Sequence, residues 1–139
     1  MKVRAITCLP VIAAFALSTG AIADDISGAD VALCSSAQAT LCSADGSCES
    51  GPPWSWNIPQ FIEIDFKAKK VNTTEASGEN RATPIKNIER ADGVVFLQGA
   101  EQGRAFSFVI DEKTGMLSVA VARDGVTVSV FGACTPKPR

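Results

Sequence analysis

Hydrophobic and polar residues alternate along much of the chain from residue 60 onward, and short turn sequences interrupt the alternation. Ile62, Ile64 and Phe66, for example, are separated by single acidic residues. A period of two residues is typical of a strand with one buried face. The pattern predicts six strands, at residues 62–66, 83–90, 94–97, 106–110, 117–121 and 126–130.

The sequences between these strands are short and contain turn formers. Asp92-Gly93, Thr114-Gly115 and Asp124-Gly125 each mark a reversal of the chain. Short connections permit antiparallel neighbours but exclude parallel crossovers, which need a dozen or more residues. We therefore expect an all-β fold, a small antiparallel meander of about six strands that forms a barrel or sandwich.

Residues 24–59 have a different composition, rich in Ser, Gly, Ala and Pro. We expect an irregular, disulfide-stapled N-terminal wrap that covers one end or edge of the sheet. Together with residues 60–139 it makes one structural domain.

The first residues have the layout of a signal peptide. Lys2 and Arg4 precede an apolar run at 5–17, and small residues follow at 21–23. The run of about 13 residues is too short for a ~30 Å hydrocarbon core, which needs about 20 residues. Residues 1–23 are therefore predicted to be a cleaved signal peptide, which leaves no membrane span. We expect a periplasmic or secreted bacterial protein.

Removal of the leader changes the charge. The remaining 116 residues carry 11 basic and 15 acidic side chains, a net charge of −4. Nucleic-acid binding depends on clustered Lys and Arg, so this acidity argues against such a partner. We expect one monomeric domain.

Cysteine chemistry follows from the compartment. Without Cys8 in the leader, the exported chain has Cys34, Cys42, Cys48 and Cys134. An even number of cysteines in an exported chain predicts a disulfide framework. The chain has no histidine, and its cysteine spacing lacks the C-x-x-C of zinc knuckles and redox pairs, so no metal is expected.

Four cysteines allow three pairings. The turn signal Asp45-Gly46 lies between Cys42 and Cys48, and a reversal there brings them within disulfide distance. This favours the pairs Cys42–Cys48 and Cys34–Cys134.

Trp54 and Trp56 lie in the proline-rich stretch 52–61 and are the chain's only tryptophans. If this stretch is extended, residues two apart project to the same side. The pair then forms either a binding surface, because tryptophan is favoured at hot spots, or an apolar plug at one end of the sheet.

Catalytic groups are scarce. Glu63 and Asp65 are the best carboxylate pair, but they alternate with apolar residues and are expected to point into water. Histidine and tyrosine are absent, and no nucleophile motif occurs. We expect no enzyme activity and no cofactor.

Four segments, NIPQFIEIDF, TPIKNIER, IDEKTG and FGACTP, are distributed over the stretch from Ala32 to Pro136, which is most of the chain after the leader. With them it resembles a family of small, exported, uncharacterised proteobacterial proteins. The loop ASGENR, with Ser77 and Arg81, is weakly similar to the serine-glycine loop of periplasmic C-type lysozyme inhibitors, which are small disulfide-bearing β-barrels. Glu79 and Asn80 intervene before the basic residue, and no aromatic residue follows it.

These observations predict a binding or interaction module of the bacterial envelope. Its partner is an unidentified protein or small ligand, and its contact surface includes Trp54 and Trp56. The alternative is an inhibitor of a cell-wall hydrolase that acts through Ser77 and Arg81.

Overall fold

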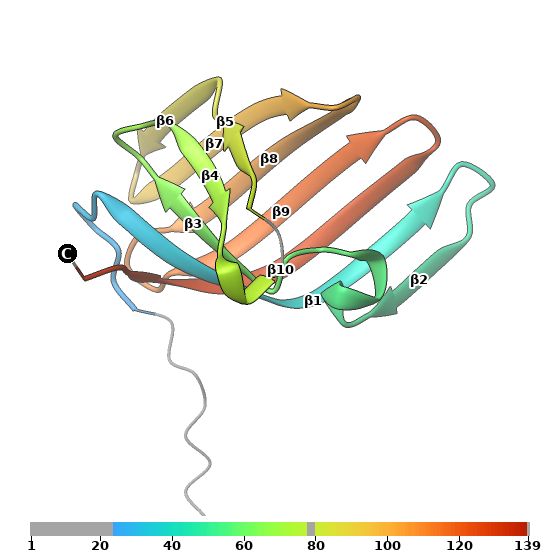
Figure 1. The fold of residues 1–139 in the computed structure, drawn as a ribbon, viewed down its shortest axis with the longest axis horizontal. Coiled ribbons are helices and arrows are strands. Elements are labelled where there is room, and N and C mark those ends of the chain that lie inside the picture. Colours follow the sequence, from blue (N-terminus) through green and yellow to red (C-terminus); the bar gives the residue numbers. More distant parts are fainter. Residues whose placement is uncertain (1–23, 78–79, 139) are drawn as a thin grey trace, which may run out of the picture.

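A computed structural model describes residues 24–77 and 80–138 (Figure 1). The predicted signal peptide, residues 1–23, lies outside the described residues. Within the described residues the protein has ten strands and two short 3-10 helices. The strands are β1 (Val31–Ser43), β2 (Cys48–Gly51), β3 (Phe61–Asp65), β4 (Lys70–Thr73), β5 (Ala82–Pro84), β6 (Asn87–Ala91), β7 (Val94–Glu101), β8 (Arg104–Asp111), β9 (Met116–Arg123) and β10 (Val126–Pro136). The 3-10 helices are η1 (Pro53–Trp56) and η2 (Glu75–Ser77).

The strands form one antiparallel sheet in the order β5-β4-β3-β1-β10-β9-β8-β7-β6, with β2 paired to β1. This confirms the predicted all-β, antiparallel fold class. The sheet curls, because its two end strands are consecutive in the chain and only two residues separate them (Figure 1). In that link the Ile85 N–H donates to the Lys69 carbonyl and the Lys86 N–H to the Gln98 carbonyl. The predicted strand at 83–90 is therefore two strands that join opposite ends of the sheet.

The expectation of an irregular segment at 24–59 is wrong for much of its length. Strand β1, with 13 residues, is the longest strand and lies between β10 on one side and β3 and β2 on the other. Its buried residues are small, Ala32, Cys34 and Ala39 among them, and alanine and serine give a weak strand signal. A register shift between Ser36 and Gln38 also breaks the alternation in the middle of the strand.

The best-filled part of the core lies at one end of the curled sheet. Val95, Ile110 and Leu117 are almost completely buried there. The segment before β1 covers this end, since Ile26 is fully buried and its N–H donates to the Glu112 carbonyl at 2.8 Å. We call this the closed end.

Both favoured disulfides are present, which confirms the predicted pairing. Each joins two residues that lie directly opposite on neighbouring antiparallel strands, Cys34 with Cys134 and Cys42 with Cys48. The first is buried beside the closed end, and the second is at the exposed tip of the β1–β2 hairpin.

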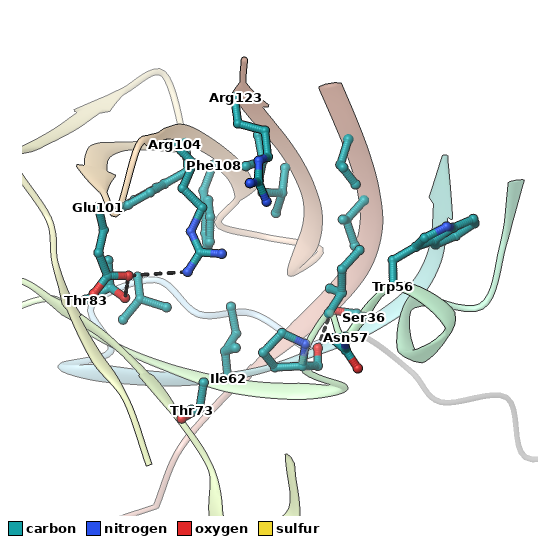
Figure 2. Close-up of a pocket in the computed structure, with 18 of the residues that line it drawn as sticks. Ser36, Trp56, Asn57, Ile62, Thr73, Thr83, Glu101, Arg104, Phe108 and Arg123 are labelled. Carbon is teal, nitrogen blue, oxygen red and sulfur yellow. Dashed lines mark hydrogen bonds and ion pairs between the residues drawn. The ribbon is translucent and has the colours of Figure 1, made fainter. Parts of the chain in front are cut away.

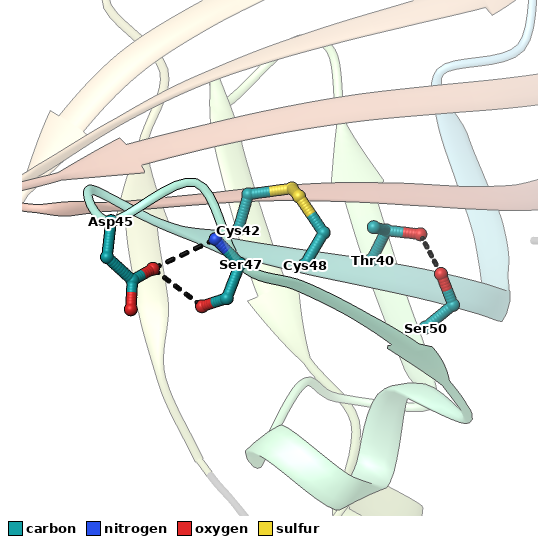
Figure 3. Close-up of a disulfide and its surroundings, with 6 residues drawn as sticks. All are labelled: Thr40, Cys42, Asp45, Ser47, Cys48 and Ser50. Carbon is teal, nitrogen blue, oxygen red and sulfur yellow. Dashed lines mark hydrogen bonds between the residues drawn. A yellow bond between two sulfur atoms is a disulfide. The ribbon is translucent and has the colours of Figure 1, made fainter.

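The hairpin tip has the turn that the sequence predicts (Figure 3). Gly46 has φ of 88°, and the Asp45 carboxylate accepts hydrogen bonds from the Ser47 hydroxyl at 2.6 Å and the Ser47 N–H at 2.9 Å. These bonds lower the pKa of Asp45.

Candidate binding pocket

The inner, concave face of the sheet contains a cavity of about 460 Å³ (Figure 2). Its volume falls within the range of small-molecule sites, about 300–1,000 Å³. Strands β8, β9 and β10 form one wall, and residues 56–59 with β3 and β4 form the other. We call this cavity the concave pocket.

Three inward-facing rows of side chains cross the sheet, because residues directly opposite on paired strands point to the same face. The charged row consists of Glu101, Arg104 and Arg123, from β7, β8 and β9. The middle row consists of Gly99, Phe106, Val121, Val128 and Leu41. The inner row consists of Leu97, Phe108, Val119, Val130 and Ala39.

Burial increases from the charged row toward the closed end. All five residues of the inner row are buried. In the middle row, Phe106, Val121 and Val128 also face inward but are only partly buried. The protein's own side chains therefore do not fill the space above the middle row.

Glycine at position 99 is needed for the shape of the middle row. A Cβ atom there would lie 2.3 Å from the Phe106 ring and 2.9 Å from the Pro84 carbonyl oxygen. The missing side chain lets the Phe106 ring approach β7. That ring also meets Phe108 edge-on, with 5.5 Å between the ring centroids.

The opposite wall is an ordered loop. The Ser36 hydroxyl donates to the Pro59 carbonyl at 3.0 Å, and the Ser36 N–H donates to the Gln60 carbonyl at 2.8 Å. Asn57 ends η1 with φ of 55°, a left-handed conformation that asparagine tolerates. These contacts hold the loop against β1.

The two tryptophans do not form the pair predicted from an extended segment. They lie in η1, and a 3-10 helix has three residues per turn, so residues two apart point to different sides. Trp56 is half-buried, borders the concave pocket and packs against Gly51 of β2. Trp54 is 60% exposed and does not border it. Pro53 suits the first turn of a helix as well as an extended chain, which the sequence pattern does not distinguish.

Ser77 and Arg81 have different environments. The Ser77 hydroxyl donates to the Phe61 carbonyl at 2.8 Å and accepts from the Phe61 N–H at 3.1 Å, so it attaches η2 to β3. Arg81 borders the concave pocket, with its Nε 3.8 Å from Oε2 of Glu101. Residues 78 and 79 lie outside the described residues, and the inhibitory role of this loop stays a prediction.

The carboxylates of β3 have structural contacts. Glu63 forms an ion pair with Lys137 at 2.5 Å, and Asp65 accepts a hydrogen bond from the Ala68 N–H at 2.7 Å. Neither borders the concave pocket. In the described ranges, no group of three or more His, Cys, Asp or Glu side chains could hold a metal ion.

Sequence reasoning missed the charged row. Its signal is present in the sequence, since Arg104 is in phase with Phe106 and Phe108, and Arg123 is in phase with Val119 and Val121. Both arginines lie next to turns, where charged residues are common and usually point into solvent. That they point inward can be predicted only if the alternation of the strand is continued to its terminal residue.

Fold and pocket together define a small, disulfide-linked, all-β protein with a ligand-sized concave pocket. No family model matches the chain, and comparisons with curated proteins and with solved structures found no match. Within the described part of the chain, no helix is long and apolar enough to cross a membrane.

Proposed function

We propose that this protein is an exported, non-catalytic binding protein of the bacterial envelope, and that it holds a small ligand in the concave pocket. The two disulfides support export, because such bonds persist in oxidising compartments. The N-terminal pattern of residues 1–23 supports it independently. Intact mass of the exported protein tests this part, with a chain beginning at Asp24 and lacking four thiol hydrogens as the expected result.

The single observation that carries the binding function is the partial exposure of the middle row. Phe106, Val121 and Val128 face into a cavity and still contact solvent. Removing apolar surface from water is favourable by about 25 cal/mol per Å². A ligand that covers the middle row therefore gains binding free energy from the apolar surface that it buries. A few polar groups at the edge of an apolar pocket are typical of small-molecule sites.

The chemistry at the pocket favours binding over catalysis. The hydroxyl of Ser36 is held by the Pro59 carbonyl, and the chain has no histidine that could activate it. Glu101, the carboxylate of the charged row, accepts a hydrogen bond from Thr83 and is paired with arginine. A carboxylate with these partners is suited to holding the arginine side chain in place rather than to transferring protons.

Tryptophan fluorescence tests the proposal, with the neutral apolar dye N-phenylnaphthylamine as the probe. In Trp54→Phe the only tryptophan is Trp56, which borders the pocket. We expect the dye to bind, gain emission and quench Trp56. In Trp56→Phe the dye should still bind, but Trp54 should be quenched less.

A matched pair of variants locates the binding. Val128→Phe places a ring in the concave pocket, whereas Thr127→Phe places the same ring on the outer face of the same strand. We expect Val128→Phe to lose dye binding and Thr127→Phe to retain it, with both variants folded by circular dichroism. Equal binding by the two variants would contradict a ligand site in this pocket.

A further inference from the structure

The charged row contains two like charges in an unfavourable position. Arg104 and Arg123 lie directly opposite on β8 and β9, and both extend toward the concave pocket (Figure 2). Like charges directly opposite on an antiparallel pair destabilise the sheet. The pair therefore works against the fold, which suggests a role for it outside folding.

The carboxylate of Glu101 compensates one of these arginines. Its Oε2 atom lies 3.5 Å from Nη2 of Arg104 and accepts a 2.7 Å hydrogen bond from the Thr83 hydroxyl. The same oxygen lies 3.8 Å from Nε of Arg81. One carboxylate thus interacts with one hydroxyl group and two guanidinium groups.

Arg123 is not compensated in this way. Among residues 24–77 and 80–138, no carboxylate forms an ion pair with it. Asp124 also borders the pocket, so the charged side chains that the described residues place around it are three arginines and two acids, an excess of one positive charge. This excess occurs in a chain whose overall charge is negative.

An apolar surface begins next to the charged row. Along β9, Arg123 is followed inward by Val121 and Val119, and along β8, Arg104 is followed by Phe106. From Arg123 to Val119 the strand extends about 14 Å, at ~3.4 Å per residue. A charged mouth and a long apolar interior match a ligand with the same two parts.

We propose that the concave pocket binds a single-chain anionic amphiphile, with its apolar chain over the middle row and the adjoining Phe108 and Val119, and its anionic head between Arg104 and Arg123. Guanidinium groups bind carboxylate and phosphate oxygens through paired N–H donors, so either head fits this position. The inference rests on the proposed binding function and adds the chemical class of the ligand.

Competition with the bound dye tests the class of the ligand. Dodecanoate, dodecyl phosphate, dodecanol and dodecyltrimethylammonium share one chain and differ in head charge, and each is used below its micelle concentration. A hydrogen bond between charged groups is stronger than one to a neutral hydroxyl, so we expect dodecanoate or dodecyl phosphate to compete about tenfold or more better than dodecanol. The cationic amphiphile should compete least, and the two anionic arms distinguish carboxylate from phosphate.

Variants identify the arginine responsible. In Arg123→Gln the preference for dodecanoate over dodecanol, both measured against the same bound dye, should fall about tenfold. Lys86→Gln removes one positive charge from an exposed residue that does not border the pocket, and should leave the preference unchanged.

The outcomes separate the two proposals. Dye binding with equal competition by dodecanoate and dodecanol overturns the anionic ligand and leaves the binding function intact. A preference that survives in Arg123→Gln also overturns it. Absence of dye binding and of any amphiphile binding overturns both proposals together.

Discussion

The closed end and the pocket end of this protein belong to one sheet, yet their inward faces differ. At the closed end, Ile26 from the preceding segment covers the sheet, and residues such as Ile110 are fully buried. At the pocket end, Phe106 and Val121 have the same inward direction but remain half-exposed, and arginines follow them. The alternation of apolar residues is the same at both ends. The difference lies in what covers each face, so burial here is a property of the fold rather than of the strand pattern.

The two disulfides show the same contrast. Both link opposite residues of antiparallel strands, but Cys34 and Cys134 are 100 positions apart and buried, whereas Cys42 and Cys48 are 6 positions apart. In the chain-entropy account, a disulfide stabilises by restricting the unfolded chain, and the effect grows with the loop it closes. The closed end should therefore depend more on its disulfide.

The largest effect is expected from Cys34→Ala/Cys134→Ala. Loss of a loop of this length should lower the free energy of unfolding by about 4–5 kcal/mol. The lost sulfur atoms also leave unfilled space in a buried site, which adds to the destabilisation. Urea unfolding followed by far-ultraviolet circular dichroism measures the change. A small domain has a free energy of unfolding of only ~5–15 kcal/mol, so this variant can be largely unfolded even before urea is added. Such an outcome would agree with the prediction.

A smaller effect is expected from Cys42→Ala/Cys48→Ala at the pocket end. The short loop predicts a loss of about 2 kcal/mol in the free energy of unfolding. The exposed hairpin tip retains its turn through Asp45 and Ser47, so the native circular dichroism spectrum should persist. The same urea titration compares the two double variants directly. A loss equal to or larger than that at the closed end would contradict the contrast between the two ends.

The sequence predicts those parts of the fold that depend on local pattern. Strands such as β8 and β9 alternate large apolar residues with smaller or polar ones. The turn at Asp45-Gly46 indicates one disulfide, which leaves the other two cysteines to pair. Strand β1 could not be predicted in the same way. Its buried residues are small, and the irregularity near Ser36 shifts its phase.

The concave pocket depends on non-local structure. Arg104 and Arg123 are 19 positions apart in the chain, and only the register of β8 with β9 places them opposite each other. The curl of the sheet follows from the two-residue link between its end strands β5 and β6, where Ile85 and Lys86 form hydrogen bonds that no local pattern indicates. Trp56 was singled out from the sequence, and its place at the pocket follows from η1 rather than from the extended geometry expected for it.

The smallest effect is expected at the segment that covers the closed end. The Asp25 carboxylate is bonded by Ser27 and forms an ion pair with Lys113 at 3.0 Å, and these contacts lower its pKa from 3.8 to about 2. A pKa lowered in the folded state means that the ionised carboxylate favours folding. Its contribution is fully present above the unfolded pKa and is lost as the pH falls from about 4 toward 2.

Asp25→Asn should therefore be slightly less stable than the wild type at neutral pH and equal to it near pH 2, by urea midpoints at each pH. The contribution is small because the group is exposed and screened by solvent. Lys113→Gln removes the ion pair but keeps the hydrogen bonds from Ser27, which are the larger cause of the lowered pKa. Lys113→Gln should therefore lose only part of the pH-dependent stability that Asp25→Asn loses. If Lys113→Gln abolishes all of it, the ion pair and not the Ser27 turn holds Asp25 in its ionised form. A difference between wild type and Asp25→Asn that is the same at both pH values would show that the carboxylate charge does not help to hold this segment over the closed end.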